Sequence, residues 1–114
     1  MTSAAATAGE VREVIPVLPM SALAEGEMAA CRVGREEVLI VNVDGQFYAV
    51  SNFCPHAGQR LSTGRLDGHR LACPLHRAVF DVRSGAPLSG PATTALVRYP
   101  VIVERGKVHV VLAQ

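Results

Sequence analysis

The chain of 114 residues lacks any hydrophobic run long enough to cross a membrane, since its longest apolar stretches cover only a few residues. Residues 1–9 have neither the basic segment nor the strongly apolar segment of a secretory signal peptide. We therefore expect a cytoplasmic protein without a membrane anchor. Its composition and length predict a flexible tail over residues 1–9 and a single domain over residues 10–114.

Aromatic residues are scarce, at 4% with no tryptophan, and the net charge is only +1. A nucleic-acid-binding surface with stacking aromatics and a basic stripe is therefore not expected. The charge is nevertheless uneven, because residues 51–114 carry eight basic and only three acidic residues. The arginines of this half either form an ordinary solvated surface or dock an acidic partner. They include Arg60, Arg65, Arg70, Arg77 and Arg83.

Helical periodicity over ten or more residues is absent, and short β-rich runs separated by turn residues take its place. Strands are expected at residues 11–18, 28–33 and 78–82. Three hairpins are also expected: residues 38–43 with 46–50 around Asp44-Gly45, 65–66 with 69–72 around Asp67-Gly68, and 96–103 with 107–112 around 104–106. The sequence therefore predicts an all-β fold, a small sandwich or a partly open barrel.

Cysteines number only three, which excludes a disulfide-rich scaffold and suits a reducing compartment. Cys31 stands alone in an expected strand, where a small buried apolar role is the ordinary one. The other two belong to matched motifs, Cys54-Pro55-His56 and Cys73-Pro74-Leu75-His76. Two thiolates and two imidazoles can hold one metal centre between two loops, and this ligand set suits zinc or iron–sulfur.

Two other interpretations of these residues start from different chemistry. A structural Cys₂His₂ zinc module is compatible with the ligand set alone. A cysteine nucleophile activated by a histidine is the enzymatic alternative, but two redundant Cys/His pairs and no third orienting residue argue against it. The remaining histidines, His69 and His109, are expected to be ordinary surface or strand residues.

The extended motifs resemble those of the Rieske ferredoxin family. The segment 54–61, CPHAGQRL, is similar to the first cluster-binding loop of that family, C-P-H-x-G-x-x-L. The segment from Cys73 to Gly85 resembles the second loop, with Phe80 and Asp81 in their usual places. Arg77 departs from the family pattern, because a glycine usually follows the second histidine. In a Rieske [2Fe–2S] centre two histidines replace two cysteines on one iron.

The resemblance implies the fold, the ligands and the role. It implies an antiparallel β-sandwich base with a small inserted cluster-binding subdomain at about residues 52–92. It implies a [2Fe–2S] cluster with Cys54 and Cys73 on the inner iron and His56 and His76 on the outer one. No catalytic residues are expected, because such a protein carries single electrons from a flavin-containing reductase to a terminal oxygenase of aromatic rings.

Within the family, the small Rieske-like subunit of a nitrite reductase is an alternative that the sequence leaves open. A complete Rieske oxygenase is excluded, because its catalytic iron needs two further histidines and a carboxylate beyond one domain. The two extra cysteines of high-potential Rieske proteins are missing, since Gln59 and Leu75 fill their places. The reduction potential is therefore expected toward the low end of the Rieske range.

Overall fold

The computed structural model describes residues 12–55, 58–74, 78–89 and 94–113. These residues form strands joined by short turns, with two three-residue 3₁₀ turns, η1 (Met20–Ala22) and η2 (Leu61–Thr63). In the described part of the chain no helix is long and apolar enough to cross a membrane. The tail expected at residues 1–9 lies outside the described residues. The boundaries expected for the domain and its subdomain stay predictions.

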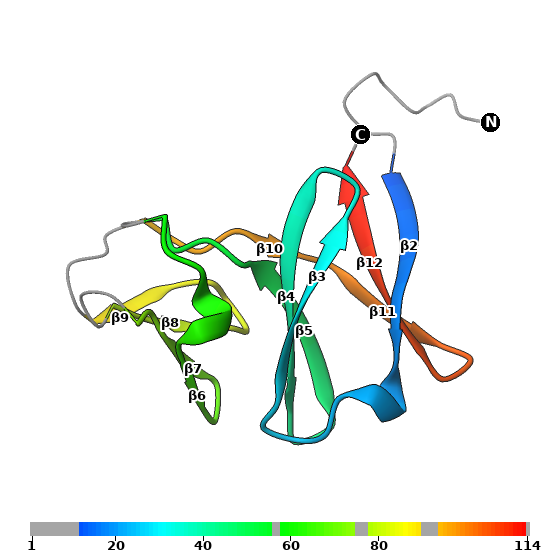
Figure 1. The fold of residues 1–114 in the computed structure, drawn as a ribbon, viewed down its shortest axis with the longest axis horizontal. Coiled ribbons are helices and arrows are strands. Elements are labelled where there is room, and N and C mark those ends of the chain that lie inside the picture. Colours follow the sequence, from blue (N-terminus) through cyan, green and yellow to red (C-terminus); the bar gives the residue numbers. More distant parts are fainter. Residues whose placement is uncertain (1–11, 56–57, 75–77, 90–93, 114) are drawn as a thin grey trace.

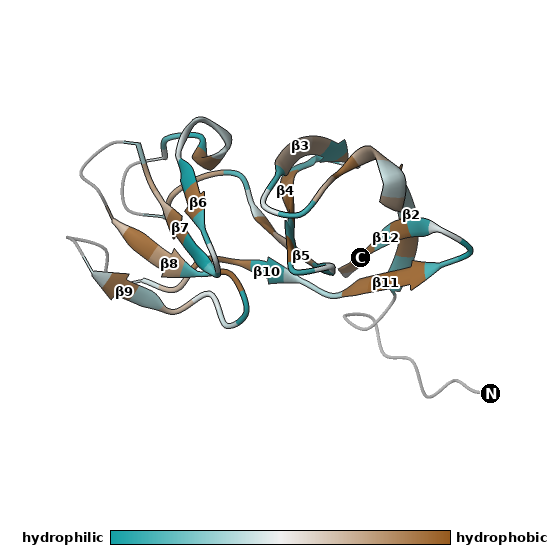
Figure 2. Ribbon diagram, turned by 90° about the horizontal axis from the view of Figure 1, so that it is seen from below, coloured by the Kyte–Doolittle hydropathy of each residue, from teal (hydrophilic) through white to brown (hydrophobic). Residues whose placement is uncertain are grey.

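Within the described residues, eleven strands make up three antiparallel sheets (Figure 1). The strands are β2 (Arg12–Pro19), β3 (Met28–Val33), β4 (Glu36–Val43), β5 (Gln46–Ser51), β6 (Arg65–Asp67), β7 (Arg70–Ala72), β8 (Val79–Asp81), β9 (Pro87–Ser89), β10 (Arg98–Tyr99), β11 (Val101–Glu104) and β12 (Lys107–Ala113). One sheet has the order β10-β5-β4-β3, the second β11-β12-β2 and the third β6-β7-β8-β9. The first two sheets form the base, and the third lies to one side of it (Figure 2). The all-β prediction is confirmed.

Strand β4 is the centre of the molecule because both of its faces are buried. Its side chains alternate between faces, as they must in a strand. Val38 and Ile40 pack with Val108 and Val110 in the core between the two base sheets. Leu39 and its alternate neighbours Val41 and Val43 face a second core, which they share with the small sheet. The small sheet is therefore held on the base by a continuous apolar contact.

The turns confirm the first expected hairpin and shift the second. Asp44 and Gly45 have φ of 53° and 86°, the two positive values that a tight two-residue turn of type I′ needs. In the second hairpin Asp67 pairs with Arg70, so the turn is Gly68-His69 and not Asp67-Gly68. Only Gly68 has a positive φ there, 59°, which fits a turn with glycine in its first position.

The strand expected over residues 96–103 is two strands in different sheets. Arg98 and Tyr99 pair with β5, whereas Val101 to Glu104 pair with β12. Pro100 lies between them, and its missing N–H prevents the ladder from continuing through it. Glu104 belongs to the strand, so the turn is Arg105-Gly106 alone. The segment Pro87–Ser89 pairs with β8 as edge strand β9, which the sequence analysis did not predict.

Tyr99 ties β10 to the start of β4, because its hydroxyl donates a hydrogen bond of 2.9 Å to Glu36 Oε1. Burial, and then this hydrogen bond, raise the pKa of Tyr99 to about 12. Because folding raises the pKa of Tyr99, the protonated hydroxyl contributes to the free energy of unfolding. This contribution is complete below pH ~10 and is lost as pH rises through about 12. We expect tyrosinate absorbance to be titrated in the unaltered protein and in Tyr99→Phe. The part of the absorbance that the substitution removes should have its midpoint near pH 12. A midpoint at the ordinary tyrosine value would contradict this.

Candidate metal centre

The first cysteine motif closes a small hairpin. The Cys54 amide donates to the Gln59 carbonyl at 2.8 Å, and the Gly58 amide donates to the Cys54 carbonyl at 2.7 Å. One step further out, Phe53 and Arg60 form an isolated antiparallel bridge. The tip between Cys54 and Gln59 is thus the segment 55–58, in which His56 and residue 57 lie outside the described residues. Gly58 has a φ of 69°, so the turn itself requires a glycine.

The second cysteine motif closes a tip of the same length. The Cys73 amide donates to the Ala78 carbonyl at 2.7 Å, the same offset along the chain as between Cys54 and Gln59. The tip is the segment 74–77, and residues 75–77, with His76 and Arg77, lie outside the described residues. Its stem is the paired ladder of β7 and β8. The two motifs therefore fold as matching hairpins, each with a cysteine at the start of a four-residue tip.

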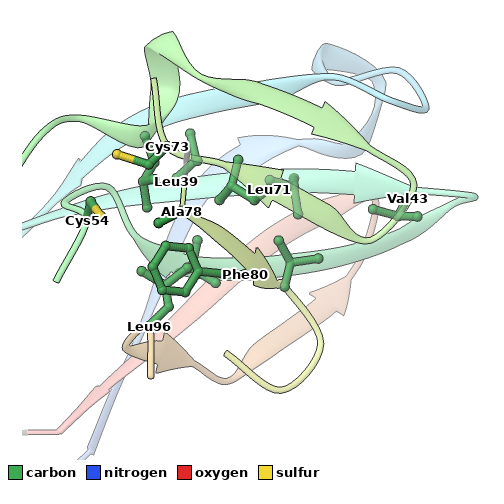
Figure 3. Close-up of a cluster of buried hydrophobic side chains, with 12 residues drawn as sticks. Leu39, Val43, Cys54, Leu71, Cys73, Ala78, Phe80 and Leu96 are labelled. Carbon is green, nitrogen blue, oxygen red and sulfur yellow. The ribbon is translucent and has the colours of Figure 1, made fainter. Parts of the chain in front are cut away.

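Packing brings the two cysteines to the same place. Cys54 and Cys73 are 1% and 2% exposed and belong to one buried cluster with Leu39, Ala78 and Phe80. Figure 3 shows both cysteines at one end of this cluster, while Val43 lies at the other. Among the described residues no group of three or more metal-ligating side chains occurs, and both histidines of the motifs lie outside that set.

Two apolar residues of the motifs anchor the hairpins. Leu61 and Phe80 are completely buried in the cluster that contains the cysteines. Leu61 comes after Arg60, at the end of the first hairpin. Phe80 lies in β8, in the stem of the second hairpin. Fully burying a side chain of this size contributes about 1.5–3 kcal/mol. The cysteine positions are thus fixed from the protein side by the core.

Two of the arginines named in the second half of the chain have carboxylate partners. Arg60 contacts Glu37 through Nε–Oε2 at 2.8 Å, and Arg83 contacts Asp81 through Nη2–Oδ2 at 2.8 Å. The hydrogen bond from Arg60 lowers the pKa of Glu37. The hydrogen bond from Arg83 lowers the pKa of Asp81 to about 2. In the described part of the chain Arg65 and Arg70 have no such ion pair, and Arg77 lies outside that part, so the docking role of these arginines stays a prediction.

The other candidates have ordinary surroundings. Cys31 is half-buried against the core between the base sheets, and burial raises the pKa of its thiol. The ring of His69 meets Tyr48 edge to face, with centroids 5.9 Å apart. His109 Nδ1 lies 3.3 Å from the Ile102 carbonyl oxygen. None of these three residues lies in the buried cluster with Cys54 and Cys73.

Two polar residues at the base of the first hairpin were missed by the sequence analysis. Asn52 is fully buried two residues before Cys54, and Glu37 reaches it from β4. Asn52 sits in a run that reads only as the end of a strand, and Glu37 is distant in the sequence. No periodicity or spacing would have joined them.

The described residues fit an iron–sulfur centre. Thiolates are its usual protein ligands, and both cysteine positions are buried side chains from facing hairpins. Of the tip residues that the structure describes, Pro55, Gly58 and Pro74 are exposed. A cluster held by the two cysteines would have the apolar core on its inner side.

Comparison with known proteins gives a consistent result. The model of the Rieske [2Fe-2S] domain matches residues 13–100. The ferredoxin component of the naphthalene 1,2-dioxygenase system of Pseudomonas putida is 35% identical over 99 residues, covering 87% of this chain and 95% of the relative. The 3-phenylpropionate/cinnamic acid dioxygenase ferredoxin subunit of Escherichia coli K12 is 39% identical over 98 residues, covering 84% and 91%.

Solved structures agree with this likeness. The ferredoxin of carbazole 1,9a-dioxygenase from Nocardioides aromaticivorans IC177 superposes with a TM-score of 0.82 at 33% identity, covering 85% of this chain and 95% of that one. A chain from the complex of reduced oxygenase and oxidized ferredoxin in carbazole 1,9a-dioxygenase gives 0.81 at 36% identity, covering 85% and 91%.

These relatives identify the cofactor and the general role. The cofactor is a [2Fe–2S] cluster, and the role is electron transfer rather than catalysis of a reaction. The earlier inference from the two cysteine motifs is confirmed at this level. The chain belongs to the Rieske [2Fe–2S] domain family.

Proposed function

We propose that Cys54, His56, Cys73 and His76 hold the cluster, with the cysteines on the inner iron and the histidines on the outer one. The observation that carries this proposal is the pair of matching hairpins, each closed by a backbone hydrogen bond from its cysteine. Both cysteines lie in one buried cluster, and each histidine belongs to the tip of its hairpin. The division of the ligands between the two irons is the one that the resemblance to Rieske ferredoxins implies.

A cluster of this type, when bound, accepts and releases one electron at a time. The protein contributes the geometry around it. Leu61, Phe80 and the rest of the apolar cluster exclude water from the cysteine side. Pro55 and Pro74, which follow the two cysteines, are exposed, so a partner can approach the protein at the two tips. Electrons would enter and leave at the tips.

The partners we propose are a flavin-containing reductase and a terminal oxygenase that acts on an aromatic ring, in the cytoplasm. The relatives named above are ferredoxin components of such dioxygenase systems. One of the similar solved structures contains an oxygenase together with its ferredoxin. A zinc module, the alternative that the ligand set alone allowed, has no comparable support.

The test combines metal analysis, spectroscopy and transfer. Protein expressed with sufficient iron should contain two irons and two acid-labile sulfides per chain. It should be EPR-silent when oxidised and give the low average g-value of a mixed His/Cys cluster when reduced. The reduced protein, mixed anaerobically with an oxidised terminal oxygenase of an aromatic-ring dioxygenase system, should then deliver one electron per chain.

Three results would argue against parts of this proposal. Stoichiometric zinc after iron-replete expression would overturn the cofactor. Two irons with the EPR features of a four-cysteine cluster would overturn the ligand set. A normal Rieske spectrum without electron transfer to the oxygenase, but with transfer to a nitrite-reducing subunit, would support the alternative within the family.

A further inference from the structure

The two cysteine hairpins differ in how they are braced. The stem of the second is three residue pairs of the small sheet, Arg70 with Asp81, Leu71 with Phe80 and Ala72 with Val79. The stem of the first has a single isolated bridge, Phe53 with Arg60. A single bridge gives little resistance to opening, because local stability follows the number of buried contacts and hydrogen bonds. The first hairpin therefore needs another source of rigidity.

Asn52 provides hydrogen bonds across the open end of the first hairpin. Its Oδ1 accepts from the Ser62 amide at 2.8 Å, and its Nδ2 lies 3.2 Å from Ser62 Oγ. Its carbonyl accepts from the Leu61 amide at 2.6 Å. Asn52 is 0% exposed, so these bonds are shielded from water. The two arms of the hairpin are thus joined by the side chain and the carbonyl of Asn52, and not by a ladder of paired strand residues.

Glu37 connects this junction to the base sheet. Its Oε2 accepts from Asn52 Nδ2 at 2.6 Å and from Arg60 Nε at 2.8 Å. Its backbone carbonyl also accepts from the Asn52 amide at 2.9 Å. Glu37 belongs to β4, the strand whose two faces are both buried. One carboxylate on strand β4 therefore contacts both arms of the hairpin, at Asn52 and at Arg60.

We propose that Glu37 and Asn52 form a polar clamp that positions the first cluster-binding hairpin and with it Cys54. The clamp takes the place of the strand ladder that braces the second hairpin. Asn52 and Glu37 are positioning residues, since neither belongs to the proposed ligand set. The inference rests on the proposed function, in which Cys54 is a ligand. In this proposal Glu37 and Asn52 affect how firmly the cluster is held, although neither residue binds it.

The first test is Asn52→Asp, which keeps the shape and removes the amide donor to Glu37. A second variant, Asn52→Leu, has a similar size and cannot share a proton with Glu37. In both, buried partners lose hydrogen bonds that hold the hairpin. We expect cluster loss to a chelator to be roughly tenfold to a hundredfold faster, which corresponds to about 1.4–2.8 kcal/mol. Visible absorbance measures the rate.

The matched control is Asn42→Asp in the base. Asn42 is also a buried asparagine, at 5% exposure, and its Nδ2 donates to the Leu23 carbonyl at 2.9 Å. The hydrogen bonds of its side chain are with Leu23 and Gly45, and neither residue belongs to the first hairpin. We expect Asn42→Asp to unfold at a lower temperature than the unaltered protein. While it is still folded, it should lose its cluster at nearly the same rate as the unaltered protein.

Rescue separates positioning from general destabilisation. In Asn52→Asp combined with Glu37→Gln, the amide and the carboxylate exchange places, and a donor again faces an acceptor across the clamp. We expect this double variant to recover most of the slow cluster loss. The reduction potential and the width of the EPR lines should move away from the original values in Asn52→Asp and Asn52→Leu and return in the double variant.

The inference is overturned if Asn52→Leu and Asn52→Asp lose their cluster no faster than Asn42→Asp, with an unchanged potential and EPR spectrum. It is also overturned if the exchanged pair is no better than Asn52→Asp alone. Failure of the proposed function would look different, because the unaltered protein would then lack the mixed His/Cys spectrum before any clamp residue was changed.

Discussion

Cys54→Ala and Cys73→Ala should each be purified without the [2Fe–2S] cluster, whereas Cys31→Ala should be fully loaded. Each of the first two changes removes one thiolate ligand, and neutral alanine cannot replace a thiolate on iron. The cysteines are small and lie in an apolar cluster, so alanine fits the space without burying a new polar group. Loss of the chromophore would therefore report on ligation rather than on packing. Iron, sulfide and visible absorbance per chain measure it.

Cys31→Ala is the matched control, because it makes the same change in a different core. Cys31 lies in β3 and packs against the cluster between the base sheets, away from the two hairpins. Its thiol Sγ is 4.0 Å from the Ala29 carbonyl oxygen, a weak contact whose loss costs little. If Cys31→Ala also lost the cluster, or if Cys73→Ala kept two irons and two sulfides, the proposed ligand set would be wrong.

The centre was more predictable from the sequence than the parts that hold it. The Cys/His motifs are local, so their spacing alone indicated two facing loops and their chemistry indicated a metal. The hairpin at Asp44-Gly45 was equally local, since both turn residues tolerate positive φ. By contrast, the Gly68-His69 turn and the break at Pro100 depend on which strands pair. Pairing is decided by contacts distant in the sequence.

The polar clamp shows the same limit at a functional position. Glu37 looked like one of several acidic residues in the first half of the chain, and Asn52 looked like the end of a strand. Their 2.6 Å contact exists because β4 and the segment after β5 are neighbours in the base sheet. The arginines show the same limit. Arg60 pairs with Glu37 and Arg83 with Asp81, and a count of charges along the sequence does not identify these partners.

Gly85→Ala should be among the most destabilising single-methyl changes in the described chain. Gly85 has a φ of 79°, where a side chain adds strain of about 1–3 kcal/mol. A Cβ there would also overlap the Leu96 carbonyl oxygen. The Leu96 amide donates to the Gly85 carbonyl at 2.7 Å, so this contact joins the turn after β8 to the chain that returns to the base. Relieving the overlap costs about another 1–3 kcal/mol.

Together the two costs should lower the midpoint of thermal unfolding by roughly 10 °C or more, measured by circular dichroism on the protein with its cluster bound. Two other glycines separate the two contributions. Gly26 has a φ of 83° and no atom within 4 Å of an added Cβ, so Gly26→Ala tests strain alone. Gly64 has a φ of −86°, but an added Cβ would overlap the Ala72 carbonyl oxygen, so Gly64→Ala tests crowding alone.

Gly64→Ala should differ from the other two in what it does to the cluster. Ala72 directly precedes Cys73, so moving its carbonyl displaces a proposed ligand as well as a strand. We therefore expect Gly64→Ala to lose the cluster faster at temperatures where it is still folded, and Gly26→Ala to lose it at the original rate. If Gly26→Ala destabilised the protein as much as Gly85→Ala, crowding at Leu96 would contribute nothing. The segment at Leu96, which leads back to the base sheets, would then not require a glycine at position 85 for space.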